Sequence, residues 1–298
     1  MDFFALPFGI VFKHISHILT LVFQSDVANY ALTIIFFTLF VKILLFPLSL
    51  KQQLSTLKTQ ALQPELDALK RAYGNDNQAM MQEQQKLYAK YNVNPLSGCL
   101  PTLIMFPVII IVYSIIRSPL TYIAGISSDA LTKLAEIAEG FDATKTIDQL
   151  ALNSYFLKLD AGSPVLEQAN EIMAGKSFVN MHFLGLDLGT SPNVVFTGFE
   201  WSWAVLGLLL IPLLTLGTQY LLQWYSSPTR GKKKDKNADP TARGMNVMMK
   251  LMPLLTFVIA FTFPSGLGFY WIISNLFSLL QTFLINTFFI KKNEKEVI

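Results

Sequence analysis

The sequence predicts an all-α polytopic membrane protein, with five transmembrane helices around a hydrophilic groove and a cytoplasmic helical hairpin. Three observations support this fold class. Hydrophobic residues make up 52% of the chain and charged residues only 14%, whereas soluble domains carry about 25% charged residues. The apolar residues fall in long blocks rather than in the narrow stripes of a soluble helix. One block contains a single cation, Lys42. A cation inside a span costs roughly 2.5–3.5 kcal/mol, so Lys42 is expected to contact water, a partner or a substrate.

Five apolar blocks are close to the length of about 20 residues that a helical span needs. They are 28–50, 98–117, 203–224, 247–263 and 267–289. Several contain proline, which membrane helices tolerate when neighbouring groups satisfy the freed carbonyls. The last two blocks are joined by 263–267, whose Pro and Gly predict a tight turn. These two spans therefore form an antiparallel hairpin.

The segment 1–27 is apolar but carries Lys13, His14 and His17 in its middle. A cleaved signal would have its positive charge before the apolar stretch and small residues at its end. An amphipathic helix lying in the outer membrane interface fits the pattern better. An uncleaved anchor remains the alternative.

Two segments outside the spans have distinct compositions. Residues 51–93 are polar and rich in good helix formers, with a Gly/Asn/Asp turn near 74–77, which predicts a helical hairpin. Pro64 is expected to kink its first arm. Residues 118–200 are irregular and predict a cap of small helices and loops, whose fold and role the sequence leaves open.

The distribution of charge predicts the orientation of the chain. Segments 51–93, 225–247 and 291–298 hold 15 of the 23 Lys and Arg residues. By the positive-inside rule these segments are cytoplasmic. The hairpin 51–93, the basic loop 225–246 and the tail 290–298 are thus predicted inside, and the N-terminus and 118–200 outside.

Polar residues recur on one face of three spans, because residues four or seven apart share a face of a helix. The candidate groove residues are Thr38, Lys42, Gln219, Gln223, Trp271, Asn275 and Ser278. Ser49 and Thr215 extend the first two of these stripes, and Thr282 extends the third. If the stripes converge, they line a hydrated groove.

Each of these residues also has a simpler, purely structural interpretation. Ser, Thr and Asn hydrogen-bond between membrane helices in many proteins, and tryptophan is common in interfacial belts. The ammonium of Lys42 could reach the interface by snorkelling.

No cofactor or metal site is predicted, and no enzyme. His14 and His17 share a helical face but lack a third ligand nearby. The sequence has no phosphate-binding glycine loop and no acid/base constellation among its spans. The basic run 230–236 is of a kind that attracts anionic lipid or ribosomal RNA, although a loop that only sets the topology explains it as well. DNA is not expected as a partner.

Several motifs, in order and spacing, resemble those of the YidC insertases of the YidC/Oxa/Alb family, in their short Gram-positive-like form. These motifs are Lys42-Ile-Leu-Leu-Phe-Pro47, Lys51-Gln-Gln53, Gln60-Ala-Leu-Gln-Pro64-Glu65, Tyr91-Asn-Val-Asn-Pro95, Met105-Phe-Pro107, Phe263-Pro-Ser-Gly-Leu-Gly-Phe-Tyr-Trp271, Ser274-Asn275 and Gln281.

The resemblance implies a bacterial cell-membrane protein with a groove open to the cytoplasm and to lipid but closed outside. Lys42 matches a position usually held by a functional arginine, and Thr38 and Trp271 match other groove positions. Either Gln219 or Gln223 matches a polar groove position. The resemblance implies nascent membrane proteins as substrates, received at the hairpin 51–92. The ribosome, through the basic loop and tail, and the Sec translocon are further partners consistent with it.

The alternative function is a small-solute or ion transporter or channel in which Lys42 is an anion or proton site. Transporters of that kind usually show inverted repeats with discontinuous helices in both halves. No such repeat is visible in this sequence, which favours the insertase.

Overall fold

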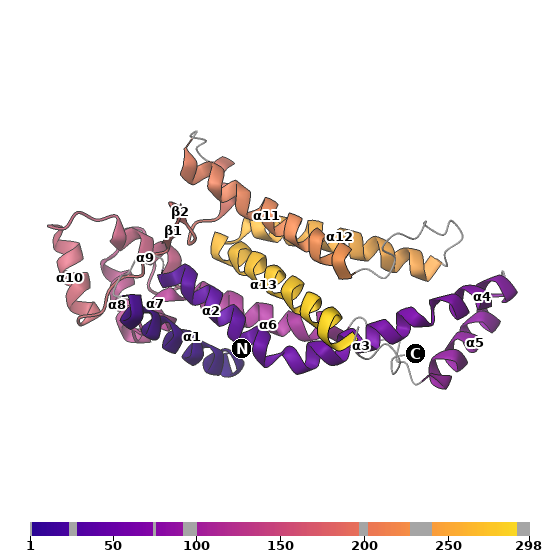
Figure 1. The fold of residues 1–298 in the computed structure, drawn as a ribbon. Coiled ribbons are helices and arrows are strands. Elements are labelled where there is room, and N and C mark those ends of the chain that lie inside the picture. The colour runs from indigo at the N-terminus through magenta and orange to yellow at the C-terminus, as the bar shows by residue number, and fades with distance from the viewer. Residues whose placement is uncertain are drawn as a thin grey trace.

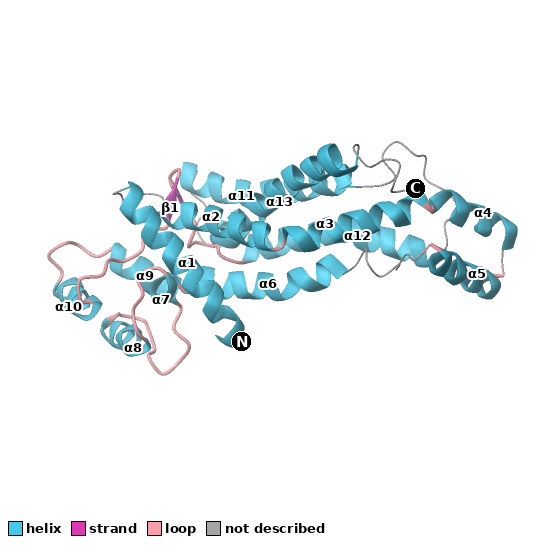
Figure 2. Ribbon diagram, turned by 60° about the horizontal axis from the view of Figure 1, so that its bottom comes forward, coloured by secondary structure: helices cyan, strands magenta, loops and turns pink. Residues whose placement is uncertain are grey.

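The computed structural model describes residues 2–23, 29–73, 76–91, 100–196, 202–226 and 240–290. It is an elongated helical protein, in which a cap of short helices and a helical hairpin lie at opposite ends of a bundle of long helices (Figures 1 and 2). The predicted all-α membrane fold is confirmed. Residues 227–239 of the predicted basic loop and 291–298 of the predicted tail lie outside the described residues. The predictions made on these two stretches therefore also lie outside the described structure.

The bundle contains most of the long apolar helices. They are α1 (Asp2–Phe23), α2 (Asn29–Leu44), α6 (Leu100–Ile116), α11 (Trp203–Ser226), α12 (Pro240–Thr262) and α13 (Ser265–Leu284), the last continued by the π-helix η3 (Ile285–Ile290). Two continuous stretches, Trp203–Ser226 and Ser265–Phe288, are long and apolar enough to cross a membrane. A bent pair formed by α2 and α3 (Phe46–Ala61) makes a third. Shorter apolar stretches lie at Pro7–Phe23, Pro107–Ile116 and Lys250–Thr262.

The first predicted span, 28–50, is not one straight helix in the structure. The helix axis turns by 60° between α2 and α3. Pro47 occupies the first turn of α3, where its missing N–H and fixed φ suit a helix start but end the preceding ladder of hydrogen bonds. The hydroxyl of Ser49 donates to the Leu45 carbonyl at 3.0 Å, a bond that often accompanies helix bending. The bend therefore separates Ser49 from the stripe of Thr38 and Lys42, and α3 runs past residue 50 into the hairpin.

The hairpin consists of the end of α3, α4 (Gln63–Tyr73) and α5 (Asn77–Lys90). The first arm breaks between Ala61 and Gln63, just before Pro64. Leu62 and Leu66 are buried and pack with Leu87 and Tyr88, which joins the two arms. Asp76 caps α5 through the Ala79 N–H, whereas Gly74 and Asn75 of the predicted turn lie outside the described residues.

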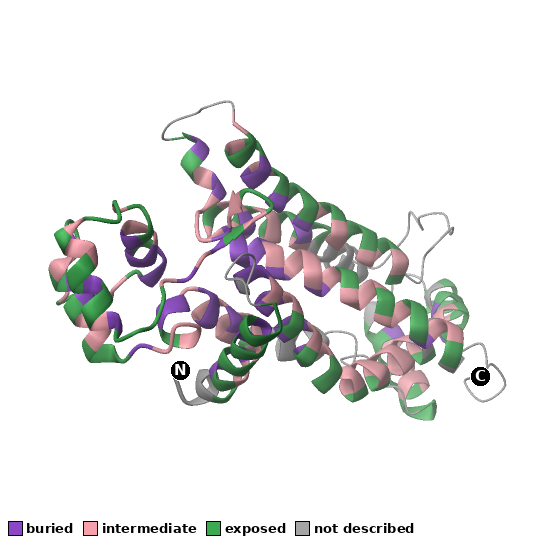
Figure 3. Ribbon diagram, turned by 60° about the vertical axis from the view of Figure 1, so that its left-hand side comes forward, coloured by how far each residue is buried: buried purple, intermediate pink, exposed green. Residues whose placement is uncertain are grey.

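The cap is formed by residues 119–196. It contains α7 (Pro119–Tyr122), α8 (Ser128–Ile137), α9 (Gln149–Leu157), α10 (Pro164–Met173), the antiparallel strands β1 (His182–Phe183) and β2 (Leu186–Asp187), and the 3-10 helix η2 (Pro192–Phe196). Its short helices have a core of their own, centred on Leu134, Leu152, Phe156 and Met173. Figure 3 shows buried residues within these short helices.

The strands tie the cap to the start of α13. The N–H groups of Ser265 and Gly266 donate to the carbonyls of Thr190 and Leu188 at 3.0 and 2.7 Å. The Ser265 hydroxyl also donates to Thr190 O at 2.6 Å. These bonds satisfy donors that a helix N-terminus leaves without partners, so the turn after β2 caps α13.

Helix α13 packs closely against α11 at Gly268. The Thr215 hydroxyl donates to the Gly268 carbonyl at 3.2 Å, and a β-carbon on residue 268 would lie 2.7 Å from Ile211 Cγ2. The close approach of the two helices therefore requires glycine at this position.

Gly268→Val is accordingly expected to lower the free energy of unfolding by about 1–3 kcal/mol through overpacking. Thermal unfolding of the purified protein in detergent checks this. Gly217→Val is the control on α11, because a β-carbon at Gly217 would meet no atom within 4 Å. Equal melting temperatures for the Gly268 and Gly217 variants would contradict the predicted close packing.

Candidate functional site

Lys42 lies in the last turn of α2, immediately before the bend. Its Nζ donates to the Ser278 hydroxyl of α13 at 2.7 Å. Within the described part of the chain, no carboxylate lies close enough to Lys42 to form an ion pair. A hydroxyl satisfies one of the three donors of an ammonium group without neutralising its charge. Lys42 thus contacts a neutral hydroxyl, between two apolar helices, rather than a carboxylate.

Helix α13 presents its polar residues to two neighbours. Ser278 faces α2, where it accepts from Lys42. Asn275 faces α11, where its Nδ2 donates to Thr218 Oγ1 at 3.1 Å. The structure therefore brings Lys42, Ser278 and Asn275 together around one helix, and Thr218 is a partner that the sequence patterns did not single out.

Thr38 and Thr215 have local partners. Thr38 is 1% exposed and donates to the Ile34 carbonyl of its own helix at 2.6 Å. Thr215 is fully buried, and its hydroxyl lies within 2.9 Å of Ile211 O as well as near Gly268 O. The bond from Thr215 to Gly268 matches the simpler interpretation, in which hydroxyl groups hydrogen-bond between membrane helices, whereas the bond of Thr38 stays within its own helix. Trp271 is partly buried and packs against the main core of the bundle.

The two candidate glutamines of α11 differ in their surroundings. Gln219 is partly buried, and its carbonyl oxygen is a buried acceptor without a hydrogen-bond partner. Gln223 is also partly buried but has a polar or aromatic contact. On α13 the amide nitrogen of Gln281 is likewise buried without a partner. A buried polar group that lacks a partner costs about 1–3 kcal/mol, so water or a bound segment would stabilise both side chains.

A second polar contact lies beyond the bend. Gln53 Nε2 of α3 donates to Asn286 Oδ1 of η3 at 3.2 Å. Together with the pair of Lys42 and Ser278, it forms a polar seam between α2/α3 and α13/η3. The sequence gives a partial signal for it, since both residues are polar, Gln53 just after the first predicted span and Asn286 near the end of the last one. Their pairing could not be derived because it depends on the bend.

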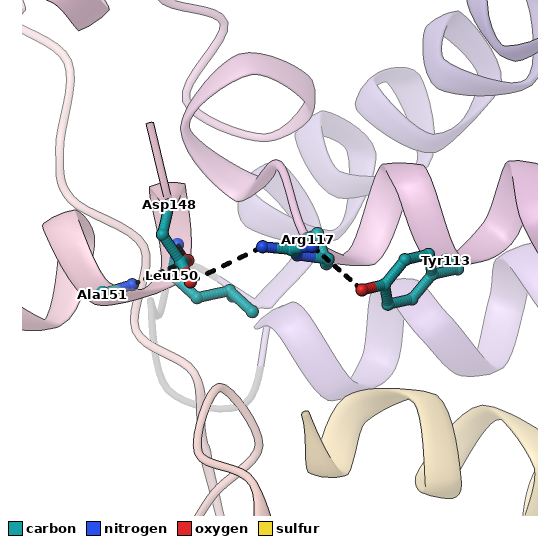
Figure 4. A network of polar contacts seen from close by, with 5 residues as sticks. All are labelled: Tyr113, Arg117, Asp148, Leu150 and Ala151. Carbon is teal, nitrogen blue, oxygen red and sulfur yellow. Dashed lines mark hydrogen bonds and ion pairs between the residues drawn. The ribbon is translucent and has the colours of Figure 1, made fainter. Parts of the chain in front are cut away.

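A separate network joins the bundle to the cap (Figure 4). Arg117, just after α6, donates to the Tyr113 hydroxyl at 2.9 Å and lies 3.6 Å from Asp148. Asp148 caps α9 by accepting from the N–H groups of Leu150 and Ala151. The charged groups of Arg117 and Asp148 contact each other and neighbouring protein groups, so this network has a structural role in holding α6 and α9 together. No three His, Cys, Asp or Glu side chains within the described ranges are arranged to hold a metal ion.

A cleft of about 430 Å³ lies between the hairpin arms α4 and α5. Its lining residues are Glu65, Ala68, Leu69, Ala72, Glu83, Lys86, Leu87 and Lys90. Glu83 raises the pKa of Lys86, through a hydrogen bond of 2.6 Å and its negative charge. The cleft has an apolar floor and a rim with charges of both signs, and it is distant from Lys42 along the chain.

Comparison with known proteins points to one family. The family described as 60Kd inner membrane protein matches residues 22–293. A relative named membrane protein insertase YidC, from Clostridium perfringens, is 28% identical over 298 residues, covering 96% of this chain and 95% of the relative. Membrane protein insertase MisCA from Bacillus subtilis is 27% identical, with 94% of this chain and 78% of the relative covered. The YidC of Amoebophilus asiaticus is 29% identical over 89% of this chain, which spans only 34% of that longer protein.

Proposed function

The chain belongs to the 60Kd inner membrane protein family, and from this premise we propose that it is a membrane protein insertase. The resemblance stated from the sequence motifs is thereby confirmed. The proposed activity is the insertion and folding of nascent membrane proteins, without catalysis of a covalent step. The observation that carries the proposal is an ammonium group on an apolar helix whose partner is a neutral hydroxyl.

The proposed mechanism is a shortened path through hydrocarbon. A polar segment that enters lipid pays several kcal/mol for each unsatisfied polar group. We place a hydrated groove around α13, where Lys42, the amide oxygen of Gln219 and the amide nitrogen of Gln281 offer hydrogen bonds to such a segment. Lys42 transiently attracts acidic residues, and the apolar helix of the substrate leaves sideways into lipid. Thr38 and Trp271 shape the wall of this groove, and Gln223, Asn275 and Ser278 belong to the same lining.

The proposed topology places α1 at the outer interface and the cap outside. The hairpin, the basic loop 225–246 and the tail 290–298 lie in the cytoplasm. In this arrangement the hairpin receives substrates, the basic loop and tail approach the ribosome, and a Sec translocon can stand beside the bundle. The membrane is the cell membrane of a bacterium.

Cross-linking separates this proposal from a solute transporter. A photoreactive amino acid in place of Ser278 is expected to cross-link to ribosome-bound nascent chains of a membrane protein. The same residue placed at Asn170, an exposed position of the cap, serves as the control. A transporter would instead show solute flux in liposomes and no nascent-chain adduct, and that result would overturn the insertase proposal.

A further inference from the structure

Two lysines distant in sequence converge on one glycine at the junction of α1 and the cap. The Lys176 ammonium, after α10, donates to the Gly125 carbonyl. A β-carbon built on Gly125 would lie 2.8 Å from Lys13 Nζ of α1. Gly125 has a φ of +68°, in the left-handed region, so this turn admits glycine far more readily than a residue with a side chain. Both ammonium groups therefore lie against the same residue.

The position of Lys13 is fixed by the packing of α1. Gly9 stands one turn earlier on the same face of the helix. A β-carbon on Gly9 would lie only 2.1 Å from Tyr122 Cε1, so α1 contacts α7 there without space for a side chain. This contact directs Lys13 towards the loop that follows α7, which contains Gly125.

Neither lysine has a carboxylate partner among the described residues, since no ion pair involves Lys13 or Lys176. This absence is informative because the region 118–200 carries an excess of acids over bases. Acidic neighbours elsewhere in the cap pair with other cations, as Asp142 does with Lys145 at 3.0 Å. Two unpaired ammonium groups at one turn repel each other, and an anion bound between them would remove that repulsion.

Helix α1 exposes aliphatic side chains in addition to Lys13, His14 and His17. Ile10, Ile18, Leu21 and Val22 of α1 have exposed fractions between 49% and 66%. A row of exposed aliphatic side chains on an amphipathic helix is suited to acyl chains at a membrane interface. A ligand that combines an anionic group with apolar chains would match both the two ammonium groups and the exposed aliphatic side chains of α1.

We propose that Lys13 and Lys176 bind the phosphate of an anionic phospholipid of the outer leaflet, with its acyl chains along α1. The inference goes beyond insertion and rests only on the proposed position of α1 at the outer interface. Its chemistry is a charge-assisted hydrogen bond from each ammonium group to the phosphate oxygens. The lipid then joins α1 to the cap.

Native mass spectrometry of the full-length protein in detergent, titrated with phosphatidylglycerol, tests the site. Each basic residue near an anionic lipid contributes roughly 1 kcal/mol. The single variants Lys13→Gln and Lys176→Gln are therefore expected to weaken binding of one lipid molecule by about fivefold, and the double variant by about thirtyfold. Lys158→Gln, another exposed lysine of the cap, is the matched control and should bind as the original protein does.

Three further measurements distinguish a specific lipid site from a folding defect and from binding of free phosphate. Replacement of both lysines by Arg keeps the charge and should restore binding, which excludes a folding defect. Phosphatidylcholine should not occupy the site, and inorganic phosphate at millimolar concentration should not displace phosphatidylglycerol. Unchanged lipid stoichiometry and affinity in the double Gln variant, or displacement by free phosphate, would overturn the proposal. None of these readouts depends on insertase activity, so a failure here leaves the proposed function to its own test.

Discussion

Lys42→Leu is expected to reduce insertion of a substrate with an acidic outer tail by about ten- to a hundredfold. Hydrogen bonds that involve a charged group contribute about 1.5–3 kcal/mol, and each 1.4 kcal/mol corresponds to a factor of about ten. The loss follows because a leucine side chain would offer the acidic segment neither charge nor donor. Lys42→Glu should be more severe because the carboxylate repels the same segment. The measurement is protease protection of the tail after insertion into proteoliposomes that contain the variant.

Two controls define what the Lys42 result means. Lys42→Arg should insert the substrate nearly as well, since arginine retains the charge in any surroundings. Ser278→Ala removes the hydroxyl acceptor at 2.7 Å but leaves the ammonium in place, so it should cost far less than Lys42→Leu. Normal insertion by the Leu variant would exclude the charge from the mechanism.

Asn153→Ala is expected to destabilise the cap by about 2–6 kcal/mol, because its side chain pairs both polar backbone groups of Val179. The side chain of Asn153 is fully buried, and it both donates to Val179 O and accepts from Val179 N–H, each at 2.8 Å. Truncation leaves two backbone groups buried without partners, each costing about 1–3 kcal/mol. Limited proteolysis during a temperature ramp should show cleavage within 119–181 at a lower temperature than in the original protein.

Asn170→Ala is the matched change on the exposed side of α10. It should alter the cleavage temperature little, because exposed substitutions usually fall within about ±0.5 kcal/mol. If the Asn153 variant resists protease as well as the Asn170 variant does, the hydrogen bonds between Asn153 and Val179 do not hold the cap together.

The apolar blocks predicted most of the bundle because length and hydropathy are local properties of the chain. Blocks 203–224 and 267–289 correspond to α11 and to α13 with η3. The interruption at Leu45 was not predicted, although Pro47 was visible, because proline is tolerated in many straight membrane helices. The bend lies at the first turn of α3, which contains Pro47, and is accompanied by the bond from Ser49 to the Leu45 carbonyl, but the presence of these residue types does not by itself decide whether a membrane helix bends.

The candidate site was predicted in part for a similar reason. Helical periodicity predicted one polar face of α13 that contains Asn275 and Ser278, whereas in the structure Ser278 contacts α2 and Asn275 contacts α11. The isolated charge drew attention to Lys42. Periodicity does not say which neighbour a face meets, so the pairing of Lys42 with Ser278 and of Asn275 with Thr218 required the structure. The cap was left open by the sequence because its order comes from contacts between distant residues, such as Asn153 with Val179.

The turn after β2 restrains the helix that carries the partner of Lys42, because it holds the start of α13. Because Thr190 and Leu188 hold the first residues of α13, this helix cannot change its tilt freely at that end. Any outward swing that separates Ser278 from Lys42 must pivot about Ser265, or else pull the strand pair along with it. A force applied to the cap would thus reach the contact between Lys42 and Ser278 through helix α13.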